Sequence, residues 1–251
     1  MVYSQNILDE KVSYQGDAWS PIGHELSIGE VLRIIKERKL VNQVGILREF
    51  LSSGEKEKYD EHKLRLPGVC FCATFDQLRR KSNLKKYNHL CVFDIDKLNE
   101  EEAQRLKSCF IADNYVYSFW ESPSGNGLKG LVAFKFEFDI SQYDINALHK
   151  IAFGKLTQYF VEKYAVTLDS SGSDITRLCF LSCDPNLHLK LDLEYFSIPE
   201  TDCAKNDVKK QDRVRSERQY SHNVSISRDC LLNPKGKNKS RDRSKIQSVI
   251  K

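Results

Sequence analysis

Two aspartates that follow an apolar run are the residues whose types and spacing point most directly to chemistry. Residues 90–96 read LCVFDID, with polar residues on both sides. An apolar run of this length predicts a buried strand, and because side chains alternate along a strand, Asp94 and Asp96 should share one face while Ile95 points into the core. Neighbouring carboxylates repel each other unless a cation lies between them, and such oxygen ligands suit Mg²⁺ or Mn²⁺. The alternative is that the strand simply ends here and both acids are solvated.

A loop rich in serine and glycine forms the second group of candidate residues. Residues 122–130 read SPSGNGLKG and connect two predicted strands. Glycine and small polar residues allow backbone N–H groups to turn toward an anion, and a lysine adds a positive charge. The residues expected to contact a phosphate are Ser122, Ser124, Gly125, Gly127 and Lys129. The spacing does not fit a Walker A loop, and an ordinary hairpin connection is the alternative.

A third acid and an arginine follow later in the chain. Asp169 comes after a short apolar segment, and Asp174, Arg177 and Asp184 follow it. An arginine that leaves a turn near an acidic site is a suitable bidentate phosphate ligand, although a salt bridge to Asp174 or Asp169 would also explain it. Together, the acids and cations match the requirements of phosphoryl transfer with two metal ions.

Regular elements surround these residues. Ser27 and Glu30 have the spacing of a capping box at the start of an apolar helical stripe. From residue 90 onward the pattern is β-α-β-β-α-β, the split βαβ order of ferredoxin-like and RNA-recognition-motif folds, in which the first and third strands are neighbours. The expected segments are strand 90–95, helix 100–110 capped by Asn99, strands 115–119 and 128–136, helix 145–164 and strand 177–182.

Composition limits the class of protein. The 251 residues contain 40% hydrophobic residues, enough for a real core, and no apolar run approaches the roughly 20 residues of a membrane helix. We find no signal peptide and no paired cysteine motif typical of zinc, so a reducing cytoplasm is the expected compartment.

Charge divides the chain into a body and a tail. Residues 201–251 hold 14 Lys and Arg against 6 Asp and Glu, whereas the rest of the chain is slightly acidic. A basic tail favours contact with polyanions, and a solvated, disordered terminus is the alternative. We expect an N-terminal helical extension over 1–54, a catalytic domain over 55–198 and a mostly disordered basic tail over 199–251.

The motifs resemble those of a known family. The Asp-x-Asp of residues 94–96, the Ser-Pro-Ser-Gly-x-Gly-Leu-Lys of 122–129 and the segment 174–185 are similar to the VirE N-terminal-type family, primase-polymerase-like domains of the archaeo-eukaryotic primase superfamily. This resemblance implies an α+β, RNA-recognition-motif-like core. It implies Asp94, Asp96 and Asp169 as catalytic metal ligands, and Ser122, Ser124, Lys129 and Arg177 around the nucleotide phosphates. Lys129 stands where the superfamily usually has His.

The resemblance implies a DNA primase or polymerase-like nucleotidyltransferase acting in the replication of a bacterial or mobile element. Its partners would be a single-stranded DNA template, nucleoside triphosphates and a helicase, separate or fused. The alternative is a non-catalytic single-stranded nucleic-acid-binding or replication-accessory module, with Tyr115, Tyr117, Phe119 and Trp120 as stacking groups.

Overall fold

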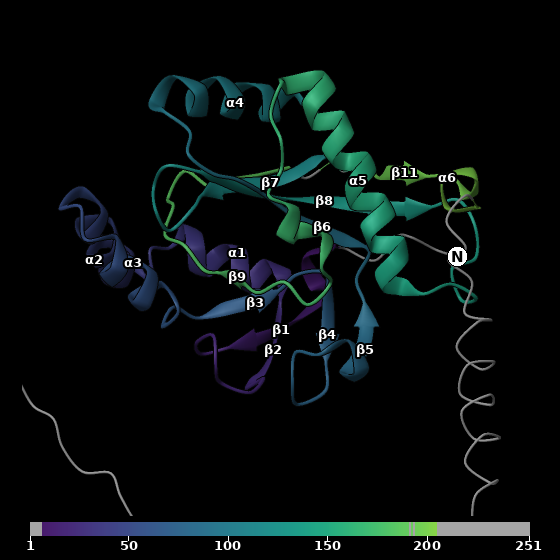
Figure 1. Ribbon diagram of the computed structural model, residues 1–251, viewed down its shortest axis with the longest axis horizontal. Coiled ribbons are helices and arrows are strands. Elements are labelled where there is room, and N and C mark those ends of the chain that lie inside the picture. The colour runs from purple at the N-terminus through teal and green to yellow at the C-terminus, as the bar shows by residue number, and fades with distance from the viewer. Residues whose placement is uncertain (1–6, 191, 193, 205–251) are drawn as a thin grey trace, which may run out of the picture. The chain divides into compact units, whose positions relative to one another are not determined.

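The computed structural model describes residues 7–190, 192 and 194–204, which form a mixed α+β fold with several antiparallel sheets (Figure 1). The α-helices are α1 (Ile28–Lys36), α2 (Val41–Ser52), α3 (Lys56–Lys63), α4 (Glu100–Ala112), α5 (Ile145–Tyr164) and α6 (Glu200–Ala204). The 3-10 helices are η1 (Ile7–Asp9), η2 (Lys81–Asn83) and η3 (Ser170–Ser173). The strands are β1 (Lys11–Gln15), β2 (His24–Ser27), β3 (Gly68–Cys70), β4 (Ala73–Phe75), β5 (Leu84–Tyr87), β6 (Leu90–Ile95), β7 (Val116–Glu121), β8 (Leu128–Phe136), β9 (Cys179–Phe180), β10 (His188–Leu189) and β11 (Phe196–Ile198).

The central sheet is built around the long strand β8. Strands β6 and β7 both pair antiparallel with the first part of β8, so they lie on its two sides, and β10 extends the sheet beyond β7. Strand β11 pairs parallel with the end of β8. The expectation that the first and third strands of the pattern are neighbours is confirmed by the pairing of β6 with β8.

Both faces of the central sheet are covered, which explains the continuous apolar run of β6. Cys91, Phe93 and Ile95 belong to the core formed with α4 and α5. Leu90 and Val92 belong to the core formed with α1 and β3. Figure 1 shows α4 and α5 on one side of β6, β7 and β8 and α1 on the other. Alternate side chains of one strand therefore serve two cores.

The prediction that residues 177–182 form the closing strand of the split βαβ order is wrong. Only Cys179 and Phe180 form a strand, β9, and it pairs with β3 in a second sheet of order β2-β1-β3-β9. Leu178 packs closely over Gly68, where any side chain would meet it at 2.8 Å. The missing side chain at Gly68 thus allows Leu178 and β9 to lie close against β3.

The predicted helix starts are confirmed. Ser27 accepts a hydrogen bond from the Glu30 backbone and Glu30 returns one to the Ser27 backbone, which completes a capping box. Asn99 and Glu102 form the same arrangement at α4. Each box satisfies backbone N–H groups that the first helical turn leaves unpaired.

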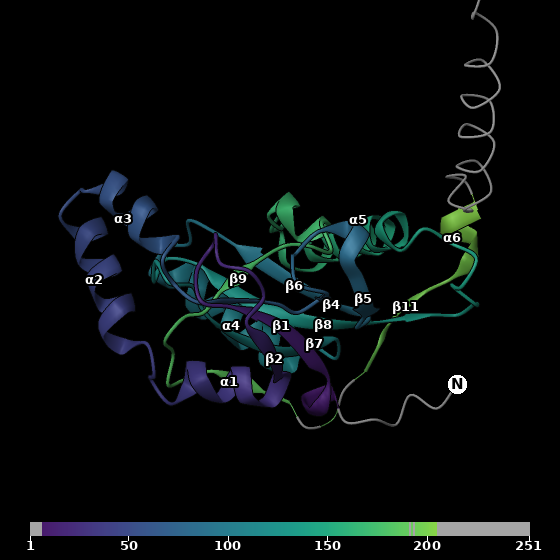
Figure 2. The same cartoon turned by 90° about the horizontal axis from the view of Figure 1, so that it is seen from below.

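Residues near the N-terminus share a sheet with later residues, because β1 pairs with β3. Strands β1 and β2 were not predicted. Helices α2 and α3 pack against each other and lie at the same end of the sheets in both views (Figures 1 and 2). The buried residues of that contact are Val44, Leu47, Tyr59, Leu66 and Cys183.

The expected basic tail falls largely on residues 205–251, which lie outside the described residues; its first part, Glu200–Ala204, is helix α6. Within the described part of the chain, no helix has the length and apolar character needed to cross a membrane.

A buried histidine links α5 to η3, and its burial should make the stability of the fold depend on pH. His149 is fully buried; its Nε2–H donates to the Gly172 carbonyl (3.1 Å), so its Nδ1 accepts from the Tyr87 hydroxyl (2.9 Å). Burial lowers the pKa of His149 to about 4, from 6.5. Between these two pKa values the imidazole is protonated in the unfolded chain but not in the folded chain. The free energy of unfolding therefore falls by about 3 kcal/mol in total as the pH drops from about 6.5 to about 4.

Urea unfolding at pH 7 and pH 4.5 measures this effect. Burial also lowers the pKa values of His89 and His188, so the comparison is with His149→Gln, which should lose most of the pH dependence. His24→Gln, at an exposed position, is the matched control and should keep it. An unchanged pH dependence in His149→Gln would contradict this assignment.

Candidate metal and phosphate site

Strand β6 places the two aspartates as its alternation requires. Asp94 continues the face of Leu90 and Val92 and is only 6% exposed, whereas Ile95 lies in the opposite core. Lys97 adopts a left-handed backbone with φ of 59°, so the chain turns immediately after Asp96. The buried carboxylate of Asp94 therefore lies within the strand, and the exposed carboxylate of Asp96 directly follows it.

Asp169 completes a cluster of three carboxylates. Its backbone N–H donates to the Asp94 carbonyl at 2.9 Å, which places η3 beside the end of β6. Its side chain accepts a hydrogen bond from the Ser171 backbone (2.9 Å) and so caps η3. One oxygen from each of Asp94, Asp96 and Asp169 lies within 4.8 Å of the others. The structure thus brings together the three acids expected to hold a metal.

A buried lysine neutralises Asp94. Lys129 stands directly opposite Asp94 in the register of β6 and β8, and its ammonium forms an ion pair with Asp94 Oδ2; both side chains are less than 10% exposed. The other oxygen, Asp94 Oδ1, is buried and has no hydrogen-bond partner among the described residues. A buried carboxylate oxygen without a partner is costly, and a cation bound by the triad would satisfy it.

Arg177 also reaches the triad. Its guanidinium lies 3.9 Å from Asp94 Oδ2 and 3.7 Å from Asp169 Oδ2. The salt bridge to Asp169 that the sequence left open is therefore present. The Arg177 side chain is about one-third exposed, so it remains accessible to a ligand as well.

The environments of the carboxylates differ. Burial and the neighbouring Asp94 carboxylate raise the pKa of Asp96. Burial opposes ionisation of Asp169 too, but hydrogen bonds from Ser171 and the charges of Arg177 and Lys129 outweigh it and lower that pKa. The charges of Lys129 and Lys63 favour the ionised form of Asp96 but do not outweigh burial and Asp94. A bound metal ion would add further support for that form.

The serine- and glycine-rich loop is folded on itself. The N–H of Ser122 donates to the Gly127 carbonyl (2.9 Å), and the N–H of Gly125 donates to the Ser122 carbonyl (3.0 Å). The Ser122 and Ser124 hydroxyls bond to each other at 2.8 Å. The N–H groups of Ser122 and Gly125 are therefore engaged within the loop.

The absence of a side chain at Gly127 allows the loop to pack closely against the end of β6 and Asp96. A substitution at this position tests whether the close packing matters for metal binding. A Cβ atom there would lie 2.6 Å from the Ile95 carbonyl and 3.3 Å from Asp96 Oδ1. Because the backbone of β6 cannot yield easily, Gly127→Ala should displace the loop or Asp96 and weaken Mn²⁺ binding by about tenfold or more.

The control for Gly127→Ala is Gly154→Ala in α5, where no heavy atom lies within 4 Å of the added carbon. This variant should leave Mn²⁺ affinity unchanged and stabilise the helix by about 0.5–1 kcal/mol. Equal Mn²⁺ affinities in the two variants, measured by calorimetric titration, would contradict the packing argument.

Three residues at the site were missed by the sequence analysis. Arg48 in α2 donates to the carbonyls of Ser122 and Pro123, each at 3.4 Å. Tyr59 and Lys63 in α3 interact with the charges of Asp94 and Asp96. The segment 55–65 alternates acids and bases, a pattern typical of a solvated helix, so only the tertiary structure reveals which of its faces meets the site.

Other residues singled out from the sequence have structural roles. Asp174 accepts bonds from the Thr176 backbone and hydroxyl, and Asp184 accepts the Glu121 N–H at 2.8 Å. The suggested stacking groups Tyr117, Phe119 and Trp120 are buried in the two cores. These three rings are therefore unavailable to nucleic-acid bases.

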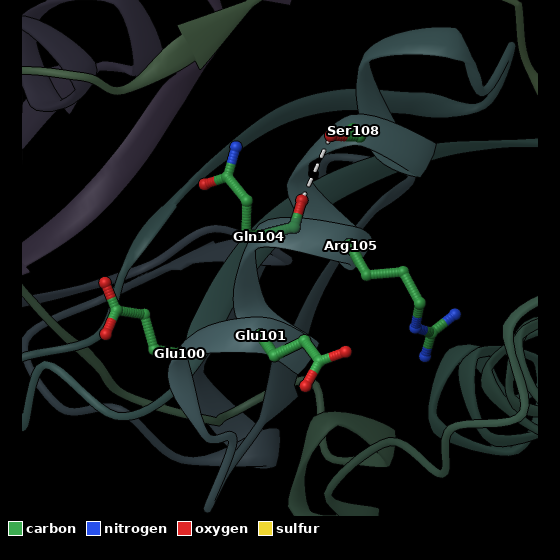
Figure 3. A pocket seen from close by; sticks show the side chains of 5 residues that line it. All are labelled: Glu100, Glu101, Gln104, Arg105 and Ser108. Atoms are coloured by element: carbon green, nitrogen blue, oxygen red, sulfur yellow. Dashed lines mark hydrogen bonds between the residues drawn. The ribbon is translucent and has the colours of Figure 1, made fainter.

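A hollow of about 690 Å³ lies elsewhere, over α4 (Figure 3). All the residues that line it come from the exposed side of this one helix: Glu100, Glu101, Gln104, Arg105 and Ser108. The Ser108 hydroxyl donates to the Gln104 carbonyl at 3.1 Å, as is common along a helix. The hollow is open surface and contains none of the triad.

The described residues thus define an α+β protein with a carboxylate triad, flanked by cations, at the end of its central sheet. Residues 61–188 match the family model described as BT4734-like, N-terminal domain. This match covers half of the chain, which therefore belongs to the BT4734-like N-terminal domain family. Neither the curated proteins nor the solved structures contain a match.

The assignment to the VirE N-terminal-type family is wrong, because the matching model describes a different family. The resemblance rested on short motifs, and acids, glycines and basic residues at such spacings arise wherever the same chemistry is needed. The helicase partner and the mobile-element context rested on that resemblance and lose their support with it. The triad, Lys129 and Arg177 stand on geometry and are unaffected.

Proposed function

We propose that this chain is a metal-dependent nucleotidyltransferase that transfers nucleotides from nucleoside triphosphates to a nucleic-acid strand. The observation that carries the proposal is the triad, in which one oxygen of each carboxylate lies within 4.8 Å of the others. The buried Asp94 Oδ1, which has no hydrogen-bond partner among the described residues, supports it. Such a set of hard oxygen ligands fits Mg²⁺ or Mn²⁺.

The acidic and the basic residues of the site have different proposed roles. Asp94, Asp96 and Asp169 would hold the metal, which supplies charge neutralisation and activation of the attacking hydroxyl. Lys129 and Arg177 lie against the same carboxylates and would bind the phosphate oxygens. As fixed cations they would stabilise the charge that develops on the leaving pyrophosphate.

Charge balance supports a polyphosphate substrate. Without a ligand, Lys129 and Arg177 neutralise most of the triad. A divalent ion bound to the carboxylates releases these side chains from their partners and makes the site positive. A positive site of this kind attracts a strongly anionic triphosphate.

Further features agree with a nucleic-acid substrate. The order β6-α4-β7-β8, with β8 between β6 and β7, supports a ferredoxin-like or RNA-recognition-motif-like core as the finer description of the fold. The net positive charge of residues 201–251 would add salt-sensitive affinity for a single-stranded DNA template. We place this activity in the cytoplasm.

Primer extension and de novo synthesis on single-stranded DNA, with Mn²⁺ or Mg²⁺, test the proposal. The wild type should make metal-dependent products, and the Asp94→Ala/Asp96→Ala double variant should make none. Tight, metal-independent strand binding by both proteins without any product would contradict the proposal and favour the binding module instead.

A further inference from the structure

Helix α3 differs from an ordinary surface helix in the position of one lysine. Lys56 pairs with Asp60, Lys58 with Glu55 at 2.7 Å, and the following Arg65 with Glu61. Lys63, the remaining lysine of the helix, has no carboxylate within 4.0 Å in the described part of the chain, and its ammonium lies 5.6 Å from the centre of the Tyr59 ring.

Lys63 lies beside Tyr59, whose hydroxyl reaches Ser124 of the serine- and glycine-rich loop. Gly127 of the same loop packs against Asp96 at the end of β6. Burial and the neighbouring charge of Lys129 lower the pKa of Lys63, and Arg177 adds to this effect, whereas Asp94 and Asp96 oppose it. A half-buried ammonium without a paired carboxylate is electrostatically unfavourable in the free protein. Such an arrangement is useful if an anion binds there.

The packing of the helices holds Lys63 in this place. Tyr59 is one turn before Lys63 on the same face of α3, is 7% exposed and has its hydroxyl within hydrogen-bonding reach of Ser124. Arg48 fixes α2 to the same loop through the Ser122 and Pro123 carbonyls. Helix α3 therefore forms a fixed wall beside the triad.

We propose that Lys63 is a phosphate-binding residue that contacts the polyphosphate chain of a nucleoside triphosphate bound at the triad. This inference rests on the proposed function and names its substrate contact more fully. With Lys63, three cations face three carboxylates, so each bound metal ion adds net positive charge that matches the phosphate chain. Tyr59 is a positioning residue for Lys63 and for the loop.

The test compares Lys63→Met with Lys56→Met, which removes an exposed, paired lysine of the same helix. The probe is a dATP analogue with an imido bridge between the α and β phosphates, titrated with Mn²⁺ present; deoxyadenosine is the phosphate-free control. Lys63→Met should weaken analogue binding by about 10- to 100-fold. Lys63→Arg should recover part of the loss, and Lys56→Met should bind as the wild type.

Binding of Mn²⁺ alone separates this contact from a structural role. Loss of a cation near the carboxylates should leave Mn²⁺ affinity unchanged or raise it, so the two affinities move independently or in opposite directions. Wild-type analogue affinity in Lys63→Met, or parallel losses of Mn²⁺ and analogue binding, would overturn the inference. A wild type that binds no Mn²⁺ would instead overturn the proposed function, and analogue binding without metal would still show whether Lys63 contributes.

Discussion

The Asp96→Asn variant is expected to lose about 100- to 1,000-fold or more of its metal-dependent nucleotide incorporation while keeping its fold. Asp96 is the exposed member of the triad and forms no ion pair within 4.0 Å in the described residues. Its carboxylate is therefore available to a metal ion and contributes little to packing. Amide substitution keeps the shape of the side chain and removes the charge that a divalent ion requires.

The stability of the Asp96→Asn variant can be predicted separately from its activity. Burial and Asp94 raise the pKa of Asp96, so the folded state holds a proton more tightly than the unfolded state does. Stability from this group therefore rises as pH falls through the raised pKa, and the ionised side chain opposes folding at pH 7. Asp96→Asn should unfold at the same or a higher urea concentration than the wild type at pH 7.

Asp60→Asn is the matched control, because Asp60 is an exposed aspartate of α3 paired with Lys56. It should retain full activity. An Asp96→Asn protein that is folded and fully active would show that this carboxylate takes no part in the reaction.

The Asp94→Asn variant is expected to lose about 3–5 kcal/mol of folding free energy, because it leaves the Lys129 ammonium buried without its partner. The two side chains are 9% and 8% exposed, and the ion pair joins β6 to β8 near the end of β6. Arg177 at 3.9 Å offers the lysine no compensation, since it carries the same charge.

The double variant Asp94→Asn/Lys129→Met should recover most of this loss, because it removes both charges together. Lys135→Met is the matched control: Lys135 lies on the same strand with an exposed partner, Glu137, at 3.5 Å, and should cost no more than about 1 kcal/mol. Urea unfolding of the wild type, the single variants Asp94→Asn and Lys129→Met, and the double variant gives the coupling free energy between the two side chains. Additive losses in Asp94→Asn and Lys129→Met would contradict a buried ion pair.

Local sequence signals predicted the central elements well. The strands over 90–95 and 128–136 and the helix over 145–164 have the predicted bounds, because apolar residues and clear end signals mark each of them. Strand β1 was missed. Its five residues bury Val12, Ser13 and Gln15 together, and this mixed pattern becomes a strand only through pairing with β2 and β3, far away in the sequence.

The candidate site divides in the same way. Asp94 and Asp96 were identified from alternation along one strand, which is a local property. Lys63 could not be identified in this way, because the direction in which it faces depends on how α2 and α3 pack through Val44, Leu47 and Tyr59. The expected closing strand was wrong for a related reason: β9 pairs with β3, whose Gly68 lies about 110 residues earlier and makes room for Leu178.

Calorimetric titration of the full chain with Mn²⁺ tests the central claim most directly. We predict saturable binding to the wild type, lost in Asp96→Asn and retained in Asp60→Asn. Folded wild-type protein that shows no saturable Mn²⁺ binding, or Asp96→Asn protein that binds Mn²⁺ as tightly as the wild type, would contradict the assignment of the triad as a metal site.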